Sequence, residues 1–312
     1  MDLLVEKIDL KRPVYFIGYQ SLYGSSILRA HQISKGLDLF YGIKSELIFI
    51  EDCINLKNFQ SIVGHIKNAT VIMIKGNFFF LDAINTFLDF LKENGNKMIL
   101  DLIDYIYFTK WQKLFMTIYR YDAIIVQNDF IKDEIVNRYS YTGNCKVIKH
   151  HWDPNIQKQI YNTSETPLKI CFTGLVRDHV DSPELNCNYL DELGIYIGHH
   201  FDQYYPCHYS VRKKNTWQAL TKSNIKLSNA SASGSNIIIT PDESIKDIID
   251  PEYPYLMKDD TLEEARRMVE YVKETYGGPV WEKGLEMMEV IRQKTSLNKV
   301  IPKYVELFQE LD

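Results

Sequence analysis

Residues 226–240 read KLSNASASGSNIIIT and determine which fold the chain can adopt. Their first part predicts a short helix over about 225–233, in which Lys226 and Asn229 share one face. Gly234 can adopt the left-handed conformation with which many helices end. The apolar run over 236–240 then predicts a buried strand. The stretch is therefore one helix–glycine–strand unit of a parallel sheet.

Strands and helices alternate through the first half of the chain. The apolar run over 13–18 ends in Gly18, as a buried parallel strand often does. The predicted strands are 13–18, 45–50, 69–74, 98–104, 121–127 and 146–151, and the predicted helices are about 25–39, 55–67, 83–94, 108–121 and 129–138. This alternation predicts a doubly wound parallel α/β sheet.

A polar segment divides the chain. Residues 155–167 (NIQKQIYNTSETP) are rich in Ser and Thr and end in Pro, which is typical of an interdomain linker. The strand LKICFTG follows it, and further strands over 194–198 and 235–240 predict a second, shorter α/β domain. From Thr261 onward the pattern is helical, with Ser296 as the N-cap of an amphipathic last helix. We expect a Rossmann-like domain over 1–160, another over 161–285 and a helical tail over 286–312.

Composition and charge exclude several classes of protein. The 312 residues suffice for two domains, and 45% hydrophobic with 25% charged residues is typical of a globular protein. A net charge of -5 disfavours nucleic-acid binding, because neutralising phosphates needs a surplus of Lys and Arg. The 5 cysteines lack C-x2-C spacing, so we expect neither a disulfide framework nor a zinc site. Without a membrane-length apolar run or a signal-peptide core, the sequence predicts a cytoplasmic protein, with peripheral contact to a membrane surface left open.

The stretch 226–240 resembles the donor-binding signature of GT-B glycosyltransferases, particularly the family 4-like group. In that signature an acidic residue five positions before the Gly binds the donor ribose, and that position here is Asn229. Two positions depart from the signature. One version of it has a Glu-x7-Glu pair, and the first Glu of that pair is replaced here by Thr221. The Pro that follows the Gly in the family is replaced here by Asn236. The resemblance implies two Rossmann-like domains that face a central cleft, with the C-terminal helices crossing back to the first domain.

The same resemblance implies that Arg212 and Lys226 neutralise the diphosphate of a nucleotide-sugar donor. A departing nucleoside diphosphate gains negative charge, which fixed cations stabilise better than water does. Arg binds a phosphate through its planar fork, and Lys acts as a point charge. Lys213 and Lys214 are neighbouring alternatives.

Other positions would complete the donor site. Gly174 ends the strand LKICFTG and precedes Arg177, and the resemblance implies that this turn faces the donor pyrophosphate. Glu243 and Ser244 follow the strand over 236–240, where parallel sheets bind ligands. We expect them near the sugar or the ribose.

The first domain would supply the acceptor side. Gly24 and Ser25 stand where backbone N–H groups of a helix start can bind an anion, and Arg29 follows them. The loop over 18–29 lacks G-x-G-x-x-G, which disfavours a dinucleotide site. Asp104, with Asp101 as the alternative, is the candidate polar residue or base near the end of a central strand, although an Asp there also suits a helix N-cap.

No metal or cofactor is expected. The chain has no D-x-D motif, the usual metal–diphosphate ligand of the other main glycosyltransferase fold. Residues 150–151 and 199–200 are each a pair of adjacent histidines. Adjacent side chains on an extended segment point to opposite sides, so the two histidines of a pair cannot easily bind one metal ion.

The sequence therefore predicts a glycosyltransferase of hexosyltransferase type that moves a sugar from a nucleotide-diphosphate sugar to a hydroxyl of a glycan or other acceptor, in glycan or polysaccharide synthesis. Two alternatives stay open: a GT-B-fold sugar-nucleotide epimerase, and a noncatalytic GT-B-like binding protein.

Overall fold

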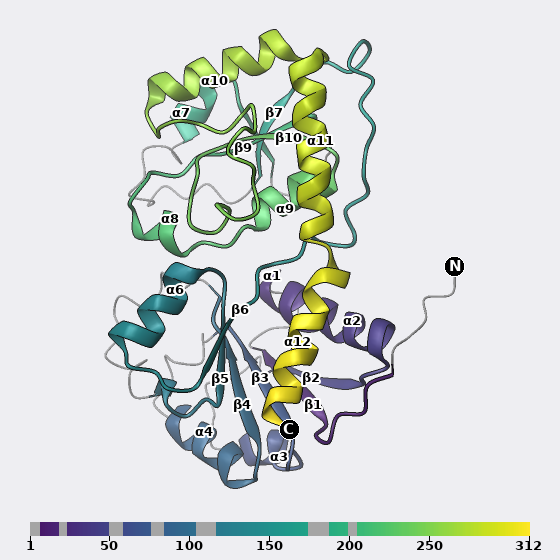
Figure 1. Ribbon diagram of the computed structural model, residues 1–312, viewed down its shortest axis with the longest axis vertical. Coiled ribbons are helices and arrows are strands. Elements are labelled where there is room, and N and C mark those ends of the chain that lie inside the picture. Colours follow the sequence, from purple (N-terminus) through teal and green to yellow (C-terminus); the bar gives the residue numbers. More distant parts are fainter. Residues whose placement is uncertain are drawn as a thin grey trace. The chain divides into compact units, whose positions relative to one another are not determined.

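The structure is a computed structural model that describes residues 7–18, 24–49, 59–75, 84–103, 117–173, 187–198 and 205–312. The chain forms two compact units (Figure 1). Unit 1 comprises Met1–His150 and Leu297–Asp312, and unit 2 comprises His151–Ser296. The first unit therefore ends ten residues before the expected boundary at 160, and only the last helix of the expected tail 286–312 joins it.

Unit 1 is built on a six-stranded parallel sheet with the order β2-β1-β3-β4-β5-β6. Its strands are β1 (Val14–Gly18), β2 (Ser45–Phe49), β3 (Thr70–Ile74), β4 (Lys97–Asp101), β5 (Ala123–Val126) and β6 (Asn144–Val147). Its helices are α1 (Gly24–Ser26), the π-helical turn η1 (Ile27–His31), α2 (Gln32–Tyr41), α3 (Phe59–Val63), α4 (Ile84–Glu93), α6 (Asp129–Asp133), the π-helical turn η5 (Glu134–Arg138) and α12 (Leu297–Leu311). The order reverses direction at β1, as in a doubly wound fold.

The C-terminal helix α12 completes the core of unit 1, although it comes from the far end of the sequence. It packs along α2 (Figure 1). Gly36 makes this close approach possible, because a Cβ there would lie 2.7 Å from the Ile301 side chain. Buried Tyr304 and Phe308 of α12 join the same apolar cluster as Phe16 of β1.

Unit 2 contains a four-stranded parallel sheet with the order β10-β9-β7-β8. Its strands are β7 (Ile170–Thr173), β8 (Tyr196–Gly198), β9 (Cys207–Ser210) and β10 (Asn236–Ile239), and its helices are α7 (Cys187–Glu192), α8 (Trp217–Thr221), α9 (Ile225–Ala232), α10 (Leu262–Thr275) and α11 (Pro279–Lys294). Trp281 of α11 is fully buried in its core, beside Tyr255.

The sequence prediction of an α/β fold with two Rossmann-like units is confirmed. The helix–glycine–strand unit is α9, Gly234 and β10, with Gly234 at a φ of +76°. A Cβ on Gly234 would also clash with the Gln159 carbonyl oxygen, so close backbone approach requires glycine there as well. The predicted helix over 108–121 falls mostly outside the described residues.

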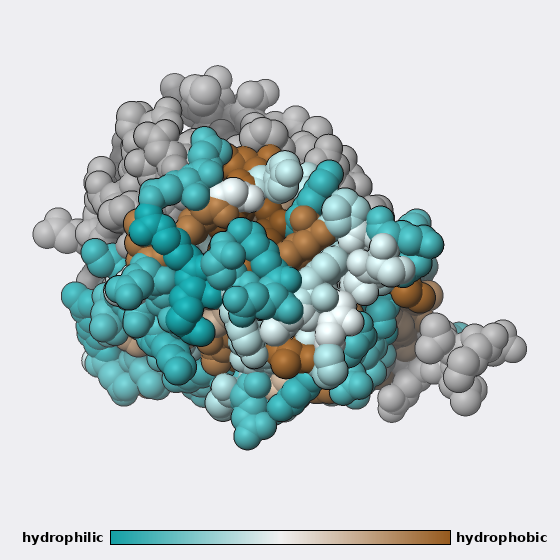
Figure 2. All heavy atoms as spheres, turned by 90° about the horizontal axis from the view of Figure 1, so that it is seen from above, coloured by the Kyte–Doolittle hydropathy of each residue, from teal (hydrophilic) through white to brown (hydrophobic). Residues whose placement is uncertain are grey.

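Hydrophilic side chains dominate the face drawn in Figure 2, with hydrophobic residues in smaller areas between them. Within the described ranges, no helix has both the length and the apolar character needed to cross a membrane.

Candidate functional site

The candidate site lies at the carboxyl edge of the unit 2 sheet, where β9 and β10 end and α9 begins. Arg212 comes two residues after β9, and Asp242 comes three residues after β10. Helix α9 brings Lys226 to the neighbouring strand β7, which lies beside β9. This edge is where open parallel sheets bind ligands.

Lys226 lies half-buried with its ammonium 3.7 Å from the centroid of the Phe172 ring. Loss of hydration, followed by repulsion from Arg212 and Lys222, lowers the pKa of Lys226 to about 7. The same cluster affects buried His208 of β9, because burial and then the charge of Lys226 lower its pKa to about 4. Within the described part of the chain, Lys226 forms no ion pair with a carboxylate. The ammonium is therefore desolvated and held among like charges, an arrangement that an anion would relieve.

Arg212 is fixed by three contacts at the ends of the strands. Its Nη1 lies 2.5 Å from Asp242 Oδ2, its Nη2 donates to the Ser223 carbonyl at 3.4 Å, and its backbone N–H donates to Thr240 Oγ1 at 2.9 Å. The Arg212 side chain is 14% exposed, whereas that of Asp242 is 2% exposed. Asp242 therefore orients the guanidinium and offsets part of its charge.

Glu243 and Ser244 lie next to this arrangement, and each has a partner of its own. The Ser244 hydroxyl and backbone N–H both donate to Asp242 Oδ1, at 2.5 and 2.9 Å, and Ser244 is fully buried. Glu243 pairs with Lys246 on the surface. The Ser244 hydroxyl fixes the carboxylate that holds Arg212, and the contact of Glu243 or Ser244 with the sugar or the ribose stays a prediction.

Asn229 connects α9 to the segment that enters unit 2. Its Oδ1 accepts the Asp153 backbone N–H at 3.0 Å, and the residue is 6% exposed. The amide nitrogen is the part of the side chain left to contact a ligand.

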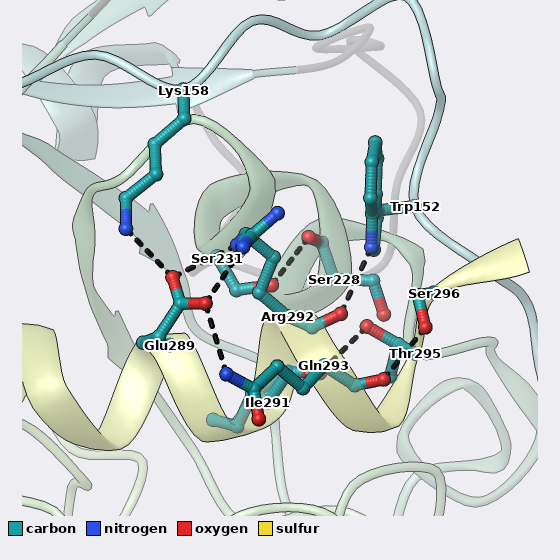
Figure 3. A network of polar contacts seen from close by, with 10 residues as sticks. All are labelled: Trp152, Lys158, Ser228, Ser231, Glu289, Ile291, Arg292, Gln293, Thr295 and Ser296. Atoms are coloured by element: carbon teal, nitrogen blue, oxygen red, sulfur yellow. Dashed lines mark hydrogen bonds and ion pairs between the residues drawn. The ribbon is translucent and has the colours of Figure 1, made fainter. Parts of the chain in front are cut away.

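A polar network holds the same entering segment on α11 (Figure 3). Trp152 donates from Nε1 to the Arg292 carbonyl at 2.9 Å and from its backbone to the Thr295 carbonyl at 3.1 Å. Lys158 pairs with Glu289 at 2.7 Å, and Glu289 also accepts from Arg292 at 2.7 Å. These contacts fix the backbone that meets Asn229.

Unit 1 places Arg29 differently from the expectation. The side chain is fully buried, and it pairs with Asp101 through Nε at 2.8 Å and Nη2 at 3.0 Å. The carbonyls of Ile148 and Lys149 accept from the same guanidinium, and Tyr304 of α12 donates to Asp101 at 3.1 Å. Burial disfavours the charged form, but the attraction of Asp101 leaves the pKa of Arg29 above its usual value. Arg29 thus joins α12 to the sheet, and its guanidinium is occupied by protein partners.

The remaining predicted residues divide into two groups. Gly24 and Ser25 form the start of α1, which is only three residues long. Asp104, Gly174, Arg177, His199 and His200 lie outside the described residues, so their roles stay predictions. In the described ranges, no cluster of three or more His, Cys, Asp or Glu could hold a metal ion.

Sequence reasoning missed Asp242 and Phe172 as site-building residues, and it did not foresee the partners of Asn236 in the core. The string TPDES after a strand contained the signal for Asp242, because an Asp two positions before a Ser commonly accepts from it. Asn236 is buried where the family has Pro, and its amide donates to the Trp281 carbonyl at 3.1 Å while its oxygen accepts from Tyr253 at 3.2 Å. Such long-range partners cannot be read from a single sequence.

No protein-family model and no curated protein sequence matches the chain. Solved structures do match over 96% of its length. Sucrose-phosphate synthase from Thermosynechococcus elongatus superposes with a TM-score of 0.65 at 10% identity, over 99% of its own chain. HepE from Anabaena, in complex with UDP and glucose, gives 0.64 at 9% identity over 100% of its chain, and a glycosyltransferase from Rickettsia africae gives 0.59 at 11% identity over 98%.

These similarities define the class of fold. The chain has the GT-B fold, a pair of Rossmann-like units with a C-terminal helix that belongs to the first unit. The matching structures include a glycosyltransferase from Rickettsia africae and HepE, the latter solved with UDP and glucose.

Proposed function

We propose that the chain is a glycosyltransferase that moves a sugar from a nucleotide-diphosphate sugar to an acceptor hydroxyl. The observation that carries the proposal is the gathering of Arg212 and Lys226 at the carboxyl edge of the unit 2 sheet. The GT-B fold supports it, as does the UDP and glucose in the structure of HepE, a protein of the same fold.

The two cations have separate roles in this proposal. Arg212, oriented by Asp242, presents its planar fork to one phosphate, while Lys226 supplies a compact charge to the other. When the bond between the sugar and the diphosphate breaks, negative charge grows on the departing diphosphate. Preorganised cations stabilise that charge, and desolvation strengthens the effect.

The acceptor proton needs a destination. As the acceptor oxygen forms its bond to the anomeric carbon, a phosphate oxygen of the departing diphosphate takes the proton. The Asn229 amide nitrogen would donate to a ribose hydroxyl. Because Arg212 and Lys226 neutralise the diphosphate, we propose that transfer needs no metal ion.

Nucleotide affinity tests this assignment directly. Calorimetry would compare UDP binding to the wild type, Arg212→Ala, Lys226→Met and Lys213→Ala. Charge-assisted hydrogen bonds contribute about 1.5–3 kcal/mol, so we expect each of the first two variants to weaken binding about 10- to 100-fold. Lys213 is the exposed neighbour of Arg212 and serves as the matched control, with a change of about twofold at most.

A thermal-shift screen against UDP, GDP, ADP and dTDP makes the test independent of the choice of base, since a bound ligand raises apparent stability. The proposal is wrong if none of them shifts the melting temperature, or if Arg212→Ala and Lys226→Met bind as the wild type does.

A further inference from the structure

The aromatic ring of Phe172 lies against the ammonium of Lys226. Phe172 belongs to strand β7 and is 2% exposed, and its ring centroid is 3.7 Å from Lys226 Nζ. The negative face of a ring attracts a cation within about 6 Å of its centroid, and the attraction grows where water is excluded. A second such pair in unit 2, Lys169 and Tyr196, is 5.7 Å apart and lies at the surface, where the attraction is weaker.

The core of unit 2 fixes the Phe172 ring in this position. Phe172 belongs to the same apolar cluster as Leu227 and Ala230 of α9, and both of those residues are fully buried. Lys226 directly precedes Leu227, so the packing that fixes α9 on the sheet also fixes the start of the lysine side chain. A closely packed interior leaves the ring little freedom to move. Because the ring offers almost no surface to a ligand, Phe172 can act on one only through Lys226.

The titratable groups around Lys226 do not favour its charged form at neutral pH. Among the residues that the structure describes, Arg212 and Lys222 repel the ammonium. Burial, and then the charge of Lys226, lowers the pKa of His208 to about 4, and burial raises the pKa of Cys171 to about 11, so neither carries a charge at pH 7. The ring face therefore supplies an attraction that these groups do not, while desolvation and repulsion lower the pKa of Lys226 to about 7.

We propose that Phe172 is a positioning residue for donor binding, whose ring face keeps the Lys226 ammonium charged and in place for the diphosphate. The ligand in this assignment rests on the proposed function, whereas the effect of the ring on the amine can be measured without a ligand. Phe172→Leu fills part of the same space but has no negative ring face. In this variant Lys226 should lose its proton at a lower pH, and UDP should bind more weakly at neutral pH.

The reactivity of Lys226 tests the ring in the ligand-free protein. The wild type, Phe172→Leu and Tyr196→Leu would be treated briefly with acetic anhydride between pH 5 and pH 9, and the acetylation of Lys226 measured by mass spectrometry. Only the unprotonated amine reacts, so the midpoint of the profile follows its pKa. We expect a lower midpoint in Phe172→Leu than in the wild type. Tyr196→Leu is the matched control, because it removes a ring from the other cation, and its midpoint should equal that of the wild type.

Replacing Phe172 by pentafluorophenylalanine separates the ring face from its packing. Fluorine withdraws electron density from the face of the ring and nearly preserves its shape, so the attraction for a cation is lost while the core stays filled. The midpoint for Lys226 should fall in this variant as well. A merely structural role of Phe172 would leave the midpoint where it is.

Calorimetry with UDP at pH 7 connects this effect to donor binding. Phe172→Leu should weaken UDP binding about three- to tenfold. In a Lys226→Met background the same substitution should change the affinity by less than about twofold, because the ring then has no cation to hold. Tyr196→Leu should bind UDP as the wild type does.

The proposal is overturned if the midpoint for Lys226 stays the same or rises in the fluorinated variant. It is equally overturned if Phe172→Leu loses the same UDP affinity with and without Lys226. Failure of the wild type to bind UDP would contradict the proposed function, and the acetylation midpoints would still decide whether the ring holds the charge of Lys226.

Discussion

Arg29 and Lys226 are two cations that the sequence places at the carboxyl edges of two parallel sheets, and the structure treats them in opposite ways. Arg29 is fully buried and its charge is cancelled by Asp101, with Tyr304 and two carbonyls completing its contacts. Lys226 is half-buried and sits among Arg212 and Lys222, which repel it. A cation with satisfied partners maintains the fold, whereas one that is desolvated among like charges is suited to receive an anion.

Breaking the Arg29 cluster should give the largest effect. Asp101→Ala leaves a buried guanidinium without its carboxylate, and removing one partner of a buried ion pair costs about 3–5 kcal/mol. Urea denaturation followed by circular dichroism would show an early transition of unit 1. The double variant Arg29→Met/Asp101→Leu should recover most of the loss, because it removes both charges.

An Asp101→Ala protein as stable as the wild type would contradict the structural role of Arg29. If UDP affinity fell in Arg29→Met/Asp101→Leu while its stability was recovered, the phosphate role first expected of Arg29 would return.

The second prediction concerns pH and tests whether the charge of Lys226 contributes to UDP binding. The pKa of Lys226 is about 7, so its positive charge is present below that pH and lost above it in the free protein. UDP affinity should therefore fall as the pH rises from 6 to 9, by at most about tenfold per unit between the pKa of the free and the bound protein. Among the residues that the structure describes, the titratable groups that interact with it are Arg212, Lys222, His208 and Cys171.

Lys226→Arg provides the control, since guanidinium stays charged throughout this range and the titration of UDP itself is common to both proteins. Calorimetry across pH should give a flatter profile for this variant. Equal slopes for the two proteins would contradict the role of Lys226.

The ligand-free protein should respond to pH in the opposite direction. Lys226 has a lower pKa in the folded state, about 7, than the value of about 10.4 in an unfolded chain. Between these values the unfolded state binds more protons, so the contribution of this residue to stability increases with pH. The melting temperature of the wild type should therefore rise relative to that of Lys226→Met between pH 7 and pH 9.

The fold could be predicted from the sequence because its signals are local. The helix at Lys226, the turn at Gly234 and the strand that follows depend on spacing and on conformational preference within fifteen residues. The site depends on partners far apart in the chain. Arg212 meets Asp242 thirty residues later, and Asp101 meets Tyr304 at a separation of 203 residues. A basic residue near a strand end therefore looks the same in sequence whether it is neutralised, as Arg29 is, or crowded by cations, as Lys226 is.

A smaller effect is expected at Asn229, whose side chain combines a structural contact with a proposed ligand contact. Asn229→Ala removes the acceptor of the Asp153 backbone N–H, which should cost about 1 kcal/mol in the free energy of unfolding. Asn229→Asp keeps an oxygen acceptor and should keep the stability, while it loses the amide donor proposed for the ribose. In calorimetry, Asn229→Ala should bind UDP a few-fold more weakly than the wild type, whereas Asn229→Asp should bind it comparably, because its carboxylate can accept a hydrogen bond from a ribose hydroxyl. Wild-type affinity in Asn229→Ala would remove Asn229 from the proposed ribose contact.

The smallest effect should come from chelation. If Arg212 and Lys226 together neutralise the departing diphosphate, the charge that a divalent cation supplies in other enzymes is already provided by the protein. Hydrolysis and transfer from UDP-glucose should then proceed at the same rate after treatment with EDTA. Magnesium or manganese added back should leave the rate of the wild type unchanged, and at most partly restore that of Lys226→Met, because an added cation replaces charge and not position. If EDTA abolished the wild-type rate and either metal restored it, the two cations would not suffice to neutralise the diphosphate. The functional role assigned to Lys226, in contrast to the structural role of Arg29, would then be contradicted.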